Sequence, residues 1–489
     1  MFVVGMASLG AEIAAARLLA PYFGASTIVW ANTIATVLVA LSIGYAIGGR
    51  IADRNPTREG LCGLVLVAAA LLAAVPFVSG PFLRASVSAL DSISAGAFVG
   101  SLLGVLALVA VPVLLLGAVA PYAIRLTVER VEDSGRVAGR LYAISTVGSL
   151  VGTFLSALAL IPLVGTRRTF LAFAIALALV AVLGMRRRFA LAPVALVALL
   201  AVPVGTVKAG EGERVIWERE TEYQYARVVE DSDGVRLLEL NEGQAVHSRY
   251  EPGAWLTGDY WDGFLLLPFA TRAAPPRRIA ILGNAAGTTA RAYGHYFPAT
   301  AIDAVEIDGD LTAVGRELFD LRAPRLRTVT EDARPFLARQ DDGRYDAIFI
   351  DAYRQPYIPF YLATREFFAL ARDKLTPGGV VVVNVGHPEG SQKLERVLSA
   401  TMGAEFTTVL RDPAQDTNTL VVATSAPAAG AGALRDRSVR LPGELRRPAL
   451  TTAARLAPGL RGGTVYTDDR APVEWLIDTS IVSYAAGER

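Results

Sequence analysis

The sequence predicts an α-helical multi-span membrane domain, followed by a small antiparallel β domain and an α/β domain with a parallel sheet. Hydrophobic residues make up 53% of the 489 residues, and the long apolar runs lie almost entirely before residue 208. Beyond residue 213 short segments alternate polar with apolar residues, and beyond residue 276 apolar strands alternate with helical segments. The predicted parts are a polytopic membrane domain at 1–208, a small β domain at 214–270, an α/β domain at 271–425 and a C-terminal tail at 426–489.

The first domain contains apolar runs that are long enough, or nearly long enough, to cross a bilayer. A hydrocarbon core about 30 Å thick needs roughly 20 apolar residues in a helix. The runs lie near 2–20, 27–49, 60–80, 97–120, 138–164, 169–185 and 190–206. Arginines follow the second, fourth and sixth runs, so the positive-inside rule places these connections and the N-terminus in the cytoplasm.

The number of spans decides on which side of the membrane the C-terminal half lies. If all of these runs crossed the bilayer, that half would lie outside the cell. The last two runs are the weakest, because they are short and joined only by Arg186, Arg187 and Arg188. We therefore expect six spans with an interfacial or re-entrant final segment, which returns the C-terminal half to the cytoplasm.

The α/β domain is indicated by apolar strands that alternate with helices. The strand segments read RRIAILG, AIDAVEID, LRTVTED, YDAIFIDAY and GGVVVVNV, and TNTLVVAT can add a final strand. This alternation predicts a doubly wound parallel sheet. Such sheets bind ligands at the carboxyl ends of their strands, so residues at these ends are the candidates for a site.

The ends of the first three strands carry the candidates for a nucleoside site. In GNAAG after the first strand, Gly283 and Gly287 allow a tight turn and a close approach of ligand to the helix N-terminus. Glu306 ends the second strand about 20 residues later, where a carboxylate can accept both ribose hydroxyl protons. The third strand leads into Asp332 and Ala333, and Asp332 can accept a proton from an adenine amino group as well as cap the next helix. Asp351 follows the fourth strand at the same edge.

Together these residues resemble the spermidine synthases, or polyamine aminopropyltransferases, in particular bacterial members fused to a membrane domain. The likeness covers about 214–425. Tyr223-Gln224 are similar to the family's Tyr-Gln pair, Gly243-Gln244 and Tyr260 to its next markers, and TDDRAPVEW at 467–475 to a C-terminal signature. The resemblance implies a Rossmann-like domain of the class I S-adenosylmethionine-dependent transferase kind.

The resemblance also implies roles for the candidate residues. The cofactor residues would be Gln224, Gly283, Gly287, Glu306, Asp332 and Ala333, the catalytic residue Asp351, and the substrate residues Gln244, Tyr260, Tyr353 and Arg354. The sequence departs from the family pattern at three positions, with Ala286 and Arg354 in place of carboxylates and Trp261 in place of a His or Gln. Because buried cations need counter-charges, these changes argue against ordinary putrescine binding.

Three functions follow as alternatives. The first is a membrane-bound transferase that moves an aminopropyl group from decarboxylated S-adenosylmethionine to an amine acceptor, with Asp351 handling the acceptor's proton. The second is a methyltransferase that uses S-adenosylmethionine itself. A basic group such as Arg354 near the methionine carboxylate would favour this second function. The third is a non-catalytic sensor of nucleosides or polyamines, or a transporter-like protein.

The expected partners are a lipid bilayer and a small amine, and a homodimer is compatible with the resemblance. The 47 basic and 46 acidic residues give a net charge of +1, which does not favour nucleic acid as a partner. The scattered His247, His295 and His387 and the lone Cys62 lack the spacing of metal ligands, so we expect no metal.

Overall fold

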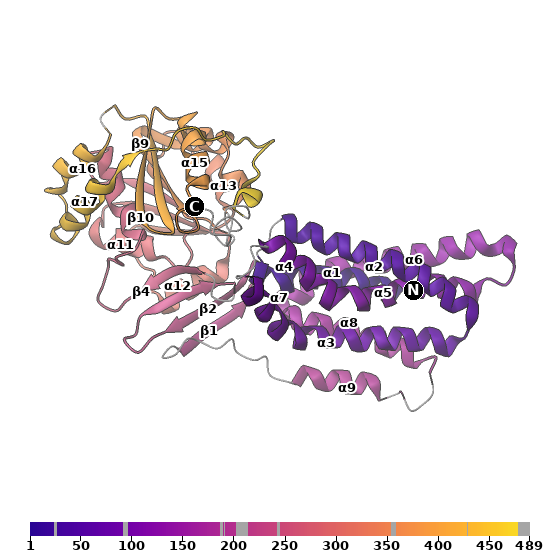
Figure 1. The fold of residues 1–489 in the computed structure, drawn as a ribbon. Helices are drawn as coiled ribbons and strands as arrows, with labels where there is room; N and C mark the ends of the chain where they lie inside the picture. Colours follow the sequence, from indigo (N-terminus) through magenta and orange to yellow (C-terminus); the bar gives the residue numbers. More distant parts are fainter. Residues whose placement is uncertain are drawn as a thin grey trace. The chain divides into compact units, whose positions relative to one another are not determined.

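The computed structural model describes residues 1–23, 27–90, 96–185, 189, 191–201, 214–241, 245–353, 358–427 and 429–477. The chain divides into two compact units, Met1–Val207 and Lys208–Arg489 (Figure 1). The first is helical and the second contains both sheets.

The N-terminal unit consists of apolar helices. They are α1 (Phe2–Phe23), α2 (Thr27–Arg54), α3 (Arg58–Leu90), α4 (Gly96–Val105), α5 (Val111–Thr127), α6 (Ser134–Leu155), α7 (Ile161–Val164), α8 (Thr166–Val182) and α9 (Ala192–Ala198). The π-helical turns η1 (Leu106–Ala110) and η3 (Ser156–Leu160) join α4 to α5 and α6 to α7. Short 3-10 turns are η2 (Val131–Asp133) and η5 (Leu199–Ala201).

Small residues let these helices pack closely. Gly152 of α6 lies against the backbone of Met6 in α1, and Gly48 of α2 lies against the backbone of Ala118 in α5, so closely that a Cβ at either glycine would overlap a carbonyl oxygen. Close backbone approach through small residues is typical of helix packing in membranes, where apolar burial from water supplies no driving force.

Five helical segments in the described part of this unit are long and apolar enough to cross a membrane: Phe2–Ala20, Val29–Arg54, Arg58–Leu83, Val99–Thr127 and Val131–Val164. The last two predicted runs differ from these. The sixth forms the 17-residue α8, which contains Arg167 and Arg168 in its first turn and packs against α1 and α3. The seventh forms only α9 and η5 among the described residues, and Pro193 lies in the first turn of α9.

The second unit begins with a four-stranded antiparallel sheet. Its order is β1 (Arg214–Glu220), β2 (Tyr225–Glu230), β3 (Arg236–Leu240) and β4 (Ala245–Tyr250). Ala226, Val228, Leu238 and Leu240 form an apolar cluster with Leu311 and Phe319 of the next domain. This contact fixes one face of the small sheet beside the larger sheet.

The larger sheet has eight strands in the order β12-β10-β11-β9-β8-β5-β6-β7. Its parallel part is β5 (Arg278–Leu282), β6 (Ala301–Glu306), β7 (Leu326–Thr330), β8 (Tyr345–Ile350) and β9 (Leu375–Gly386). β10 (Thr408–Gln415), β11 (Asn418–Thr424) and β12 (Ala457–Pro458) extend it in antiparallel fashion. The predicted fold class is therefore confirmed.

Helices join these strands and cover the sheet (Figure 1). They are α10 (Trp261–Leu266), α11 (Thr288–Tyr296), α12 (Gly309–Leu318), α13 (Ala333–Ala338), α14 (Arg365–Lys374), α15 (Lys393–Gly403), α16 (Ala431–Ser438) and α17 (Gly443–Arg455), with 3-10 turns η6 (Leu267–Ala270) and η7 (Phe360–Leu362). All six residues of β8 are buried, without alternation of buried and exposed positions, as expected for a central parallel strand.

The segment after residue 425 is more than the predicted tail. Leu434, Leu445 and Ala449 of α16 and α17 are buried in the apolar core against one face of the large sheet, and β12 pairs with β10.

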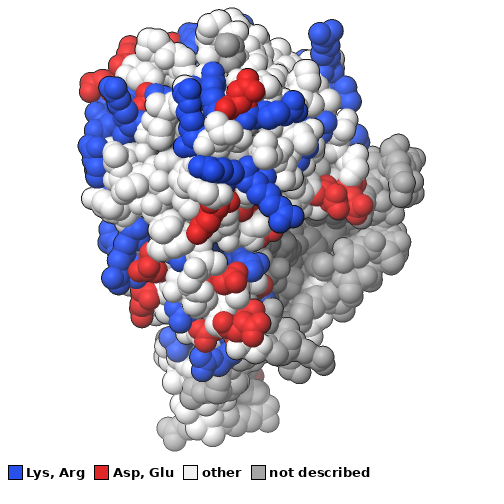
Figure 2. Space-filling view, turned by 90° about the vertical axis from the view of Figure 1, so that its left-hand side faces the viewer, with Lys and Arg blue, Asp and Glu red and all other residues white. Residues whose placement is uncertain are grey.

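Lys and Arg side chains are spread over the face of the molecule shown in Figure 2, with Asp and Glu side chains among them. On this face the charge therefore has both signs.

Candidate functional site

The loop after β5 brings backbone to the floor of a cavity. Gly283 has φ 86°, and a Cβ there would lie 2.5 Å from the carbonyl oxygen of Asp351, so this close approach requires glycine. Ala285 also adopts a left-handed φ of 45° and donates its N–H to Glu306 Oε2 at 2.7 Å. Gly287 has φ 98° and precedes α11, but it does not line the cavity and lies against Leu321. Gly287 therefore serves the turn before α11, and its contact with a cofactor stays a prediction.

Glu306 ends β6 and lies on the cavity wall with its carboxylate held by backbone. Its two oxygens accept from the N–H groups of Ala285 and Asp308, at 2.7 and 3.0 Å. Its side chain is buried, and this burial raises its pKa to about 7 although the backbone hydrogen bonds lower it. A cation or hydroxyl donor in the cavity would stabilise the ionised form.

Gln224 reaches the same cavity from the loop between β1 and β2. Its side chain hydrogen-bonds to Asp308, whose Oδ2 also accepts from the Thr221 hydroxyl at 2.6 Å. Asp308 is the N-cap of α12 and accepts from the backbone of Asp310. The small sheet is therefore tied to the carboxyl end of β6 at the position of the cavity.

Asp332 begins α13 and contacts both the helix and a cavity residue. Its Oδ1 accepts from the N–H of Arg334 at 3.0 Å, which is the N-cap role, and its Oδ2 accepts from the Tyr361 hydroxyl at 2.6 Å. Asp332, Ala333 and Tyr361 line the cavity together. The Arg334 guanidinium makes two hydrogen bonds to Asp468, at 2.7 and 2.6 Å, and a third to the carbonyl oxygen of Tyr361.

Asp351 follows β8 and accepts hydrogen bonds from three side chains. The Asn384 amide donates to Oδ1 at 2.8 Å and the Tyr260 hydroxyl to Oδ2 at 3.1 Å. The Trp261 side chain also hydrogen-bonds to it, so the tryptophan supplies an N–H donor. Burial raises the pKa of Asp351 to about 6, although these hydrogen bonds lower it. The group is mainly ionised at pH 7 and is suited to accept a proton.

The amide that holds Asp351 is itself fixed. Asn418 donates to Asn384 Oδ1 at 3.0 Å, and the Tyr353 hydroxyl donates to the Asn384 carbonyl oxygen at 2.8 Å. Tyr353 in turn accepts from the N–H of Gly386 at 2.6 Å. The carboxylate therefore has one orientation at the boundary between strands β8 and β9.

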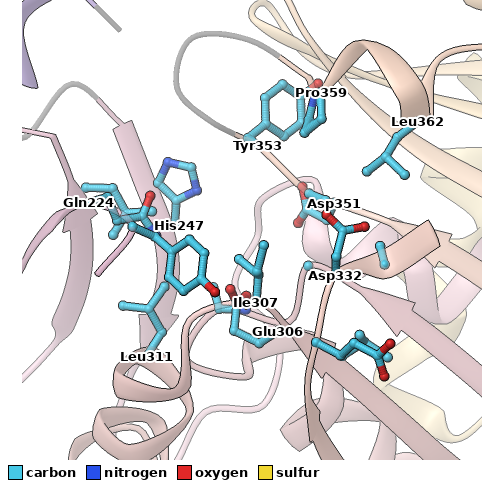
Figure 3. A pocket seen from close by; sticks show the side chains of 18 of the residues that line it. Gln224, His247, Glu306, Ile307, Leu311, Asp332, Asp351, Tyr353, Pro359 and Leu362 are labelled. Carbon is cyan, nitrogen blue, oxygen red and sulfur yellow. Dashed lines mark hydrogen bonds between the residues drawn. The ribbon is translucent and has the colours of Figure 1, made fainter. Parts of the chain in front are cut away.

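Two cavities meet at Asp351. The first holds about 700 Å³ of open space and contains Gln224, Gly283, Glu306, Asp332 and Ala333 among its lining residues. In Figure 3, Gln224 and His247 lie on one side of this cavity, Asp351 and Asp332 lie on the other, and Glu306 lies below. The second holds about 1380 Å³, and its lining residues include Tyr260, Trp261, Asn384, Asn418, Asp259 and Arg249.

The structure brings together most of the predicted site residues but not all of them. Tyr260 and Tyr353 line the second cavity with Asp351, whereas Gln244 and Arg354 lie outside the described residues. Ala286 stands where the family pattern has a carboxylate. It is fully buried in the apolar cluster beside the small sheet and lines neither cavity.

Sequence reasoning missed several residues at the site. Asn384 had a usable signal, because it is a polar residue within the apolar strand GGVVVVNV. His247 and Asp259 had none, since their places in the cavity that Asp351 also lines depend on contacts between segments about 100 residues apart in the chain, which no local pattern encodes.

Comparison with known proteins adds to this geometry. Residues 266–412 match the family model described as "Spermine/spermidine synthase domain". The chain is 37% identical over 191 residues to a "Probable polyamine aminopropyl transferase" of Bifidobacterium longum, covering 39% of this chain and 42% of the relative. It is 34% identical over 112 residues to a "Polyamine aminopropyltransferase" of Vibrio vulnificus, covering 22% and 38%.

A third relative carries a different name. The chain is 30% identical over 175 residues to "Putrescine N-methyltransferase 1" of Nicotiana tabacum, covering 35% of this chain and 44% of the relative. In each of these matches the chain spans less than half of the relative's length.

Proposed function

Residues 266–412 carry a spermine/spermidine synthase domain, and on that premise we propose that this chain transfers an aminopropyl group from decarboxylated S-adenosylmethionine to an amine acceptor. The nucleoside would occupy the first cavity and the acceptor the second. Glu306 would accept the ribose hydroxyls, Asp332 the adenine amino group, and Gln224 would close the small-sheet side.

The observation that carries this proposal is the charge of the first cavity. Four carboxylates line it, those of Glu306, Glu331, Asp332 and Asp351, and no Lys or Arg occurs among the described lining residues. The decarboxylated cofactor is a dication, with a sulfonium and an ammonium group. The parent cofactor adds a carboxylate that would meet these acids without a counter-charge, which is costly in a partly desolvated site.

The chemistry requires few groups from the protein. The acceptor nitrogen attacks the propyl carbon bonded to sulfur, the carbon–sulfur bond breaks, and its electron pair leaves with neutral methylthioadenosine. The new nitrogen–carbon bond leaves a proton to be lost from the attacking nitrogen. An alkyl amine has a pKa of about 10.4, so a carboxylate that orients the amine and accepts or relays the proton assists the step.

The position of Asp351 in the lining of both cavities supports this role. Tyr260, Trp261 and Asn384 hold it in one orientation by donating hydrogen bonds.

For the acceptor we propose a substrate with one amine at Asp351. The second cavity pairs the carboxylate of Asp259 with Gln415 and places Arg249 near it, so a free second carboxylate for a diamine is not evident among the described residues.

Methyl transfer from S-adenosylmethionine is the second candidate, because a putrescine N-methyltransferase is among the relatives. Titration calorimetry of the full-length protein in detergent with each cofactor separates the two. We expect tighter binding of the decarboxylated form, and product analysis after addition of candidate amines should show a mass gain of an aminopropyl group. Tighter binding of the parent cofactor together with methylated product would overturn the proposal.

We also propose that the N-terminal unit anchors the enzyme in the cell membrane, with the C-terminal unit in the cytoplasm where the nucleoside cofactor is expected to be available. The five long apolar helical segments support the anchor, and the 17-residue apolar helix α8 would be the sixth span that returns the C-terminal unit to the side of the N-terminus. Carbonate washing should leave the full-length protein in the membrane fraction. An impermeant thiol reagent should fail to label a cysteine introduced at Gly430 in intact cells, and labelling there would place the unit outside.

A further inference from the structure

Three side chains line both cavities: His247, Asp351 and Tyr353. Asp351 and Tyr353 are held by the hydrogen bonds described above. The third, His247, has a buried Nε2 atom that finds no hydrogen-bond partner in the described part of the protein. A buried polar atom without a partner is unfavourable, so a site that keeps one at its centre is prepared for a ligand.

The other two histidines show the contrast. Both ring nitrogens of His387 have partners, the carbonyl oxygen of Pro388 at 3.0 Å and the Thr419 hydroxyl at 3.1 Å. His295 stacks on Trp255, with ring centroids 4.1 Å apart, and it lines neither cavity. Of the three, His247 is the one whose buried nitrogen faces ligand space.

The position of His247 limits which part of the substrates it can contact. The acceptor amine must face Asp351, because that carboxylate takes its proton, and in Figure 3 His247 lies on the opposite side of the cavity from Asp351. In the proposed function the nucleoside lies toward Glu306 and Asp332, which line the first cavity. Between them lies the short chain being transferred, which ends in an ammonium group.

We infer that His247 Nε2 accepts a hydrogen bond from the terminal ammonium of the aminopropyl group, an inference that rests on the proposed function. The tautomer with its proton on Nδ1 presents Nε2 as an acceptor. Position 286 offers this ammonium no carboxylate, because it is an alanine that packs in the apolar cluster beside the small sheet. A neutral acceptor binds the cation while adding no charge near the departing sulfonium.

The ionisation of His247 agrees with this geometry. Burial lowers its pKa to about 4, so the imidazole is neutral at pH 7 and cannot repel the ammonium. A protonated imidazole would donate at both nitrogens and could accept no hydrogen bond.

Two ligands of the full-length protein test the inference. Decarboxylated S-adenosylmethionine carries the aminopropyl group, and 5′-methylthioadenosine is the same nucleoside thioether without it. His247→Ala should weaken binding of the first about tenfold, the factor expected for one hydrogen bond between an ammonium and a neutral acceptor, and leave binding of the second unchanged. His247→Gln should recover part of the loss, because its amide oxygen can accept.

The control is His295→Gln, which should change the affinity for neither ligand. Equal weakening of both ligands by His247→Ala, or no weakening of either, would overturn the inference. If the alanine variant does not fold, as judged by loss of methylthioadenosine binding and a lowered melting temperature, the comparison of His247→Gln with His247→Leu replaces it. Failure of the proposed function is distinct, since the unmodified protein would then prefer the parent cofactor.

Discussion

Replacement of Asp351 by asparagine separates proton transfer from binding. The amide keeps the size of the carboxylate, and it can keep the hydrogen bonds. Its Oδ1 can accept from Asn384, which now donates at 2.8 Å, and its Nδ2 can donate to the Tyr260 oxygen after rotation of that hydroxyl. The variant therefore removes the base and leaves the surrounding geometry in place.

The expected magnitude follows from the role of the group. A positioned general base contributes about 10²–10⁴ to the rate, so kcat of Asp351→Asn should fall by that factor. The dissociation constant of the cofactor should change far less, because Glu306 and Asp332 hold the nucleoside in this assignment. Rapid-quench measurement of methylthioadenosine formation gives kcat, and calorimetry gives the affinity.

The pH profile provides a second readout. The pKa of Asp351 is about 6, so kcat/KM of the natural protein should lose a further tenfold per pH unit below that value as the carboxylate becomes protonated. The asparagine variant should lack this limb of the profile. Retention of more than a tenth of the activity, or the same acid limb in the variant, would refute the assignment of Asp351 as the base.

Three further results are expected. Glu306→Ala should weaken nucleoside binding at least tenfold, because charged hydrogen bonds to two ribose hydroxyls contribute on the order of 1.5–3 kcal/mol each; unchanged affinity in a folded variant would remove Glu306 from the site. Glu306 has a folded pKa of about 7, above its ordinary 4.5, so its contribution to stability is full below about 4.5 and is lost as the pH rises through 7. The melting temperature should therefore decline less between pH 5 and 8 in Glu306→Gln than in the natural protein, and parallel declines would contradict this. Asp468→Asn should raise the cofactor dissociation constant by no more than about fivefold and leave kcat at saturation unchanged, since the half-exposed Arg334–Asp468 pair is worth about 1 kcal/mol or less; a large loss of kcat would show a different role.

The sequence was informative where one local pattern determines the structure. Apolar strands followed by an acid place Glu306 and Asp351 at one edge of a parallel sheet, and the fold class and the resemblance to spermidine synthases are confirmed. A glycine in a turn is ambiguous, because both ligand approach and a left-handed φ require it. Gly283 lies at the cavity, whereas Gly287 serves the turn before α11.

Other features depend on contacts that no local pattern encodes. The Ala/Gly/Pro-rich stretch 425–434 indicates a loop, yet α16 begins within it at Ala431, and Leu434 and Leu445 are buried against the sheet. The last apolar run has the composition of a span, but its described helix is only seven residues long. Composition reports how apolar a segment is, whereas its packing partner decides what the segment becomes.

The meeting of two cavities at three shared side chains has a consequence for the order of events in turnover. On the proposed function, donor and acceptor would occupy the protein at the same time, and the aminopropyl group would pass directly from sulfur to nitrogen near His247, Asp351 and Tyr353, which line both cavities. No step needs an aminopropyl group bonded to the protein. Initial-rate lines at several fixed acceptor concentrations should therefore intersect, whereas a ping-pong enzyme would give parallel lines.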